Sequence, residues 1–262
     1  MPLISDSTVE EHRTTRSVFS TTHWSVVLKA GRGGSPEAAP ALECLCRAYW
    51  YPLYAYVRRK GRAPHDAQDL VQDFFAHFLK HRHLRLADRA RGRFRTFLLT
   101  ALQNFLVNEW RKTNRLKRGG SVRVLSLDED QAESRFTAEP TVEQPSDLLY
   151  DRGWAAVLLE RALAALRAEF EQSGRLGLFE RLKGLVWGEG SGLPYETMAR
   201  QLGMTESGIK VAVHRLRQRY GELLRHEIAQ TVATPLEVDE ELRYLISIVR
   251  SGYATTVTSG RK

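Results

Sequence analysis

A glycine at position 203 divides one stretch of helical periodicity into two short helices. Glycine enters the left-handed backbone region without steric cost, so Gly203 predicts a sharp turn. Thr205 follows the turn and can cap the second helix, because its side-chain oxygen can accept a free backbone N–H. Apolar residues recur at helical spacing on both sides of Gly203: Met198, Ala199 and Leu202, with Met204 at the turn, press on the partner helix, and Ile209, Ala212 and Val213 lie on the inner side of the second helix. The stretch therefore has the spacing of a helix-turn-helix.

The outward side of the second helix is small or polar at its start and basic further along. Such a side suits the major groove of DNA. A buried helical hairpin is the alternative, but the basic run that continues to Arg219 is unusual for a core. We predict DNA binding through Thr205, Glu206, Ser207, Lys210, His214 and Arg215.

The chain has 262 residues and a net charge of +8, with a sequence pI of about 9.6. This length allows two small domains with a core each, and the charge favours an acidic partner. No apolar run is long enough to cross a membrane, and the N-terminus lacks the basic-then-apolar order of a signal peptide. We therefore expect a cytoplasmic protein without membrane insertion.

An acidic stripe runs along the helix predicted from about His65 to Lys80. Asp66, Asp69 and Asp73 recur at helical spacing beside a broad apolar face. Acidic stripes are most often solvated helix edges. In a protein this basic, a stripe without Lys or Arg also fits a docking surface for a basic protein partner.

The sequence offers no catalytic, metal or cofactor site. His77 and His81 have the i, i+4 spacing of paired metal ligands, but no acidic or cysteine ligand lies close to them in sequence. The chain also lacks a glycine-rich phosphate loop, a nucleophile elbow and a carboxylate pair in an apolar setting. We predict no cofactor, no metal and no enzymatic activity.

Residues 89–118 form a basic helical segment with nine Arg or Lys residues and the single acid Glu109. Its apolar side can dock on the preceding helices. Four residues align on the other side and can meet phosphates and base edges: Asn104, Asn108, Arg111 and Arg115. A solvated basic face would explain the charge but not the aligned asparagines. We predict that this side binds nucleic acid.

The sign of the charge reverses after residue 120, where acids dominate and Pro140 and Pro145 interrupt the chain. We interpret residues 121–150 as a linker. The predicted fold is all-α, with two small helical domains joined by this acidic linker. The expected divisions are a mobile arm (1–21), a first domain (22–120), the linker (121–150), a helix-turn-helix domain (151–232) and a tail with one amphipathic helix (233–262).

The order of these features resembles a two-domain bacterial sigma factor of the sigma-70 family, of the extracytoplasmic-function (ECF) type. The features that carry the resemblance are DAQDLVQDFFAHF, FRTFLLTALQNFLVNEWRK, the acidic linker and YETMARQLGMTESGIKVAVHRLRQRY. The resemblance implies that the first segment binds core RNA polymerase through Asp66, Asp69, Leu70, Gln72 and Asp73. It implies that residues 93–118 melt and read the −10 promoter element, and that the helix from Thr205 reads the −35 element.

The resemblance also implies transcription initiation as the function and a nucleoid-associated location in the cytoplasm. Its partners would be core RNA polymerase and promoter DNA, and an anti-sigma factor is a further partner that it allows. The sequence departs from the family at Ala212, where members commonly carry an arginine, and in the tail after residue 232.

Two other functions are compatible with parts of the sequence. A stand-alone helix-turn-helix regulator with an N-terminal sensing or dimerisation domain would explain Tyr195–Tyr220, but not the acidic stripe or the basic helix. A nucleic-acid-processing enzyme would need a carboxylate or metal constellation, and no second acidic cluster matches the Asp66 stripe.

Overall fold

A computed structural model describes residues 38–80, 93–113, 129–139, 144–187, 195–232 and 234–259. The regular elements of these residues are α-helices, with one short 3-10 helix and no strand. The predicted all-α fold is therefore confirmed for this part of the chain. The chain forms two compact units, one made of residues up to Val157 and from Ile228 onward, the other of Leu158–Glu227.

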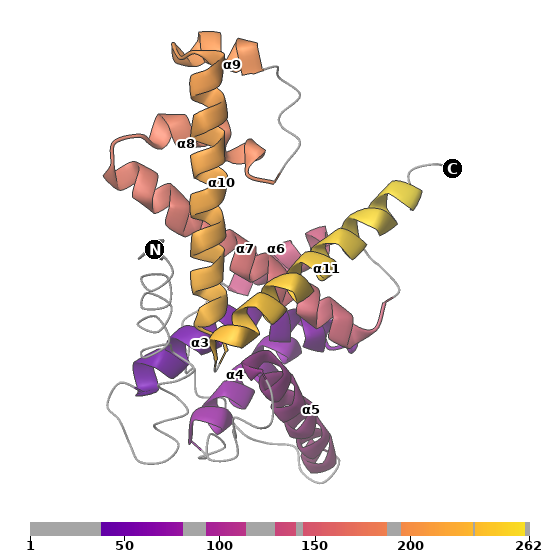
Figure 1. Cartoon of the computed structure of the whole chain (residues 1–262). Helices are drawn as coiled ribbons and strands as arrows, with labels where there is room; N and C mark the ends of the chain where they lie inside the picture. The colour runs from indigo at the N-terminus through magenta and orange to yellow at the C-terminus, as the bar shows by residue number, and fades with distance from the viewer. Residues whose placement is uncertain are drawn as a thin grey trace, which may run out of the picture. The chain divides into compact units, whose positions relative to one another are not determined.

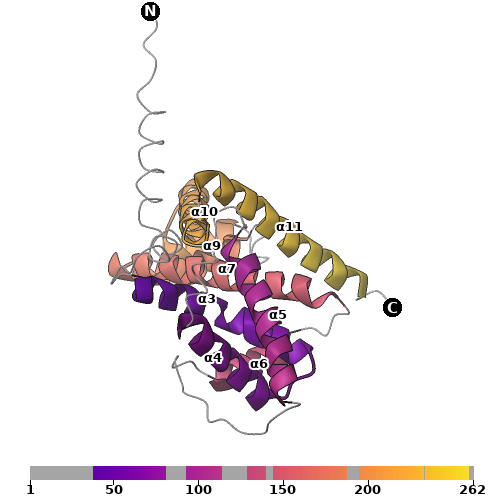
Figure 2. The same ribbon diagram turned by 90° about the horizontal axis from the view of Figure 1, so that it is seen from below.

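Three helices form the centre of unit 1: α3 (Ala38–Arg59), α4 (Pro64–Lys80) and α5 (Phe94–Thr113). They pack against one another in all three pairs, as Figures 1 and 2 show. Their contacts are rich in aromatic rings: the Tyr49 ring meets Phe94 edge-on at 5.1 Å, and Phe74 meets Phe105 at 5.7 Å. Burial of these large side chains supplies the main stabilisation of the unit.

Helix α6 (Glu129–Ala138) lies inside the segment that the sequence analysis interpreted as a linker. It packs against α3, where Arg58 forms a two-pronged ion pair with Glu133, at 2.9 Å from Nε and 2.8 Å from Nη2. The Tyr54 hydroxyl donates to the same carboxylate, and the Arg58 guanidinium lies 4.8 Å from the centre of the Phe136 ring. This part of the acidic segment is thus bound to unit 1.

Glu133→Gln is expected to destabilise unit 1 by about 1 kcal/mol at pH 7, because the substitution removes a two-pronged charged contact. Arg58, assisted by Tyr54, holds the pKa of Glu133 below its ordinary value of 4.5. A lowered carboxyl pKa stabilises the fold above pH 4.5, and this contribution is lost as the pH falls through the folded-state value.

Urea unfolding at pH 7 and in more acidic buffers measures this effect. The free energies of unfolding of the wild type and of Glu133→Gln should differ at pH 7 and become equal in acid. Glu43→Gln is the matched control, because within the described part of the chain Glu43 pairs only with Arg47, on an exposed face. An equal effect of both substitutions would contradict a role for α6 docking.

The remaining parts of unit 1 come from later in the chain. Helix α7 (Ser146–Gln172) begins in this unit, and Gly153 lies against Pro52, to which an added Cβ would come within 3.5 Å. The end of α10 (Glu206–Ala229) and α11 (Pro235–Ser259) belong to it as well. Thr231 and Val232, between these two helices, are buried.

Unit 2 contains the rest of α7, α8 (Leu176–Leu182), the 3-10 helix η3 (Lys183–Leu185), α9 (Tyr195–Leu202) and α10 as far as Glu227. Its core is formed by apolar side chains from every one of these helices, among them Leu166, Phe179, Leu185, Met198 and Ile209. The bounds of the compact units differ from the expected domains, because the predicted tail packs into unit 1 and the start of α7 does too.

None of the described helices combines the length and the apolar content that crossing a membrane requires. In the same residues, no group of His, Cys, Asp and Glu side chains could hold a metal ion. The His77 ring packs beside the Phe105 ring at 5.7 Å.

Candidate functional site

The turn between α9 and α10 has the geometry that the sequence predicts. Gly203 has a φ of 63°, and the Met204 N–H donates to the Ala199 carbonyl at 3.0 Å, which closes the end of α9. At the start of α10, the Thr205 hydroxyl oxygen accepts the Gly208 N–H at 3.1 Å. The predicted capping role of Thr205 is therefore confirmed.

The predicted DNA-binding residues at the start of α10 are all exposed: Thr205, Glu206, Ser207, Lys210, His214 and Arg215. Glu206 and Lys210 form an exposed ion pair of 2.8 Å, so the glutamate partly neutralises the lysine charge at the start of α10. His214 and Arg215 make no hydrogen bond or ion pair with the described part of the chain. Their donors are available to an external anion.

Two further arginines of α10 serve the unit itself. The Arg217 Nε donates to the Leu185 carbonyl at 2.8 Å, and Arg219 pairs with Glu169 at 2.6 Å and with Glu222 at 2.7 Å. The basic run seen in the sequence therefore has two parts. In its first half, His214 and Arg215 have no partner among the described residues and Lys210 pairs only locally with Glu206. Its second half joins α10 to α7 and η3.

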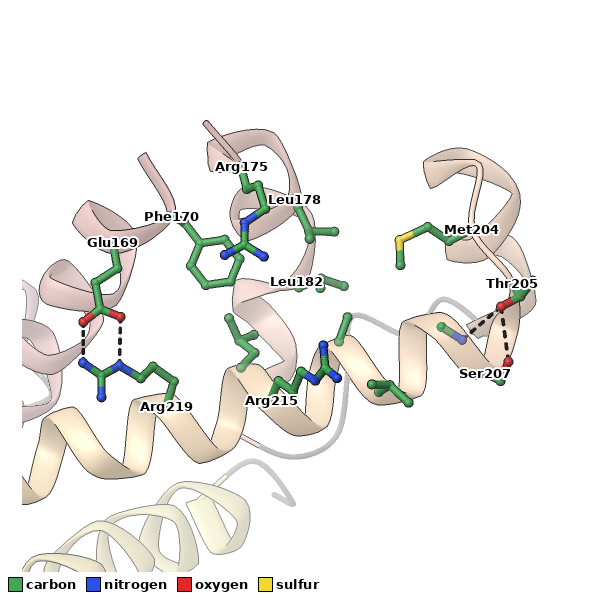
Figure 3. A pocket seen from close by; sticks show the side chains of 14 residues that line it. Glu169, Phe170, Arg175, Leu178, Leu182, Met204, Thr205, Ser207, Arg215 and Arg219 are labelled. Carbon is green, nitrogen blue, oxygen red and sulfur yellow. Dashed lines mark hydrogen bonds and ion pairs between the residues drawn. The ribbon is translucent and has the colours of Figure 1, made fainter. Parts of the chain in front are cut away.

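A pocket of about 810 Å³ lies beside the first turns of α10. Figure 3 shows its apolar wall, to which Phe170, Leu178 and Leu182 contribute, and Arg215 and Thr205 on the side of α10. Ala212 also lines the pocket, so a longer side chain at this position would extend into it. The sequence analysis did not find the pocket, because its walls come from helices that are not adjacent in the sequence: the ends of α7 and α8 and the first turns of α10.

Gly203→Ala is expected to destabilise unit 2 by about 1 kcal/mol, because an alanine at a φ of 63° is strained even where space is open. Gly221 offers a matched control: it lies within α10, and an added Cβ there would meet nothing within 4 Å. Gly221→Ala should instead stabilise the unit by about 0.5–1 kcal/mol. Thermal unfolding of both variants measures the two effects, and a shift of the same sign in both would contradict the argument.

The acidic stripe of α4 is a free surface in the described structure. Asp66, Asp69 and Asp73 are exposed and form no ion pair with a described residue. Leu70 is half-buried beside them, whereas Gln72 is only 3% exposed and has contacts within the protein. The accessible part of the predicted polymerase-binding set is therefore the three aspartates with the edge of Leu70.

On α5, Asn104, Asn108 and Arg111 are exposed and have no side-chain partner in the described residues. Trp110, on the same helix, is 60% exposed. Arg115, the fourth predicted residue, lies outside the described residues. The exposed amides and guanidinium can donate to phosphates and base edges, and the indole can stack on an unpaired base.

Residues 45–116 match the family model described as sigma-70 region 2. The matched range contains α4, α5 and all of α3 from Leu45 onward. No curated protein and no solved structure matched the chain.

Proposed function

We propose that this chain is a sigma factor of the sigma-70 family, a protein that joins core RNA polymerase and directs it to promoters. The observation that carries the proposal is the match of residues 45–116 to sigma-70 region 2. This match supports a role in promoter recognition and implies binding to core RNA polymerase and to promoter DNA. It covers the helices that bear the acidic stripe of α4 and the polar side of α5.

We further propose the two-domain ECF type, in which unit 2 supplies a helix-turn-helix for the −35 element. The capped start of α10 supports this role, and so do His214 and Arg215, which pair with none of the described residues. The exposed Asn104, Asn108 and Arg111 support reading of the −10 element by α5, and Thr205, Glu206, Ser207 and Lys210 complete the −35 face. The protein would act in the cytoplasm.

The proposed mechanism uses several small interfaces together. The α4 aspartates bind basic groups of core polymerase, α5 captures unpaired bases at −10, and α10 enters the major groove at −35. Each DNA contact alone is small and therefore weak, but attachment to polymerase raises the effective concentration of the others. Phosphate contacts make the binding fall steeply with salt.

Reconstitution with bacterial core RNA polymerase tests this function directly. The purified chain is mixed with core enzyme, the complex is isolated by gel filtration, and transcription is assayed on genomic promoter fragments. Co-elution and new specific transcripts are expected. If a folded preparation neither co-elutes nor starts transcripts, the sigma-factor proposal is wrong. Dimeric binding to an inverted DNA repeat without polymerase would instead indicate the stand-alone regulator.

A further inference from the structure

Helix α11 contributes a buried glutamate to unit 1. The buried side of this helix carries Val238, Leu245 and Ile248, and Glu241 lies among them with 1% exposure. A carboxylate in such a place is costly unless cations and hydrogen bonds compensate for its lost hydration. The partners of Glu241 therefore indicate what α11 is built to hold.

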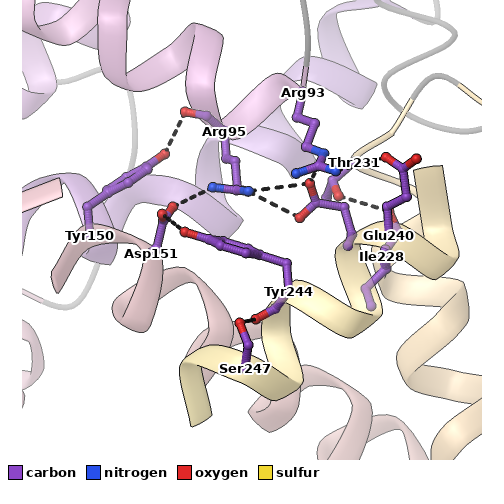
Figure 4. A network of polar contacts seen from close by, with 10 residues as sticks. Arg93, Arg95, Tyr150, Asp151, Ile228, Thr231, Glu240, Tyr244 and Ser247 are labelled. Carbon is purple, nitrogen blue, oxygen red and sulfur yellow. Dashed lines mark hydrogen bonds and ion pairs between the residues drawn. The ribbon is translucent and has the colours of Figure 1, made fainter. Parts of the chain in front are cut away.

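Those partners are two arginines at the start of α5. Arg95 donates from Nε to Glu241 at 3.1 Å, and Arg93 pairs with the same carboxylate and, at 3.0 Å, with Glu240. Arg95 also donates to Asp151 of α7 at 2.6 Å (Figure 4). One side chain of α5 is thus bound simultaneously by α7 and α11.

Aromatic groups enclose the Arg95 guanidinium. Its central carbon lies 5.0 Å from the Trp154 ring centre and 4.4 Å from that of Tyr244, both suitable for cation–π attraction. The Tyr244 hydroxyl donates to Asp151 at 2.5 Å, and the Tyr150 hydroxyl donates to the Arg95 carbonyl at 3.1 Å. Burial acts to lower the pKa of Arg95, but Glu241 and Asp151 more than compensate and raise the pKa above its ordinary value.

The position of this network on α5 is informative. Arg93 and Arg95 stand at the N-terminal end of the helix, where the helix dipole disfavours cations. The carboxylates of α7 and α11 offset this repulsion as well as the burial. The same helix carries Asn104, Asn108 and Arg111, which stay exposed while α11 is in place. Helix α11 therefore fixes α5 without covering its polar side.

We propose that Glu241 is a positioning residue for the −10 element: through Arg95 it fixes the rotation of α5, and hence the direction in which the α5 side chains face DNA. The inference rests on the proposed sigma-factor function. The C-terminal helix is then a working part of the −10 reader and not an appendage. Removal of the Glu241 charge should therefore weaken binding to the −10 element. If α11 were instead an inhibitory element, loosening it in this way would strengthen binding to the −10 element.

The adjacent glutamates allow a matched comparison of Glu241→Gln with Glu240→Gln. Glu240 has a 55% exposed side chain and, among the described residues, pairs only with Arg93. In complex with core polymerase, E241Q should lower the affinity for a single-stranded −10 oligonucleotide about tenfold or more, because a buried cation loses a charged partner. Affinity for the −35 duplex and for core polymerase should stay unchanged, and E240Q should resemble the wild type throughout.

Hydrogen exchange of the free protein provides a readout that does not depend on the sigma-factor proposal. Amides of α5 should lose protection in E241Q and keep it in E240Q. Unchanged α5 exchange together with unchanged −10 affinity would overturn the inference, and so would increased −10 affinity. If E241Q does not fold, Tyr244→Phe takes its place, since it removes only the hydroxyl bond to Asp151. If the wild type gives no polymerase-dependent transcript, the proposed function fails, and the exchange result still decides the α11 contact.

Discussion

Replacement of Asp69 and Asp73 by lysine is expected to abolish binding to core RNA polymerase while the protein stays folded. If the acidic stripe meets a basic surface, two reversed charges place like charges against each other at a cost of several kcal/mol. This corresponds to a loss of affinity of at least about 100-fold. Both side chains are exposed and have no ion pair with a described residue, so the stability should change by less than about 0.5 kcal/mol.

The double asparagine variant at the same positions is the graded control. It removes the charges without reversing them, so its affinity should lie between those of the wild type and the lysine variant. Affinity is measured by competition with a labelled sigma factor for core polymerase, and folding by circular dichroism. Full retention of binding by the lysine variant would exclude the aspartates from the interface.

Replacement of Lys210 and Arg215 by alanine is expected to weaken binding to −35 duplex DNA by about 10- to 100-fold. The duplex is taken from a promoter on which the wild type starts transcription. If both residues contact phosphates, the plot of log affinity against log salt should become shallower by about 1 per lost contact. The fold should persist, because both side chains are exposed.

Arg219 supplies the matched control on the same helix. It pairs with Glu169 and Glu222 and does not belong to the proposed reading face. Arg219→Ala should reduce stability by less than about 1 kcal/mol and leave the salt slope unchanged. If Arg219→Ala weakens DNA binding as much as the loss of Lys210 and Arg215 does, the DNA-contacting side of α10 is not the one proposed.

Local features of the sequence were sufficient to predict the turn and its cap. The left-handed backbone at Gly203 and the N-cap at Thr205 depend only on residues within a few positions. Both can therefore be predicted without knowledge of tertiary contacts. Helix periodicity likewise predicted the acidic stripe of α4. The burial of Gln72, which the resemblance and not the periodicity had added to the polymerase-binding set, could not be predicted locally, because a helix packed against two neighbours buries a wider arc than its apolar residues mark.

Contacts between distant residues could not be predicted in the same way. Glu133 pairs with a residue 75 positions away, and Glu241 with one 146 positions away. No local pattern says which arginine a glutamate will meet. The docking of α6, which the acidic composition had suggested was a linker, and the docking of α11 therefore emerge only from the structure.

The long separation between Arg95 and Glu241 also sets an order of events during synthesis. Ribosomes add about 5–20 residues per second, so Arg95 waits about 7–30 s for a partner made 146 residues later. By then all of Leu158–Glu227 has been synthesised, whereas α11 of unit 1 is still incomplete. We expect the nascent chain to expose the apolar surface around Trp154 until α11 has been synthesised. Chaperones that hold such surfaces would therefore meet the unit of α4 and α5 rather than that of α9 and α10.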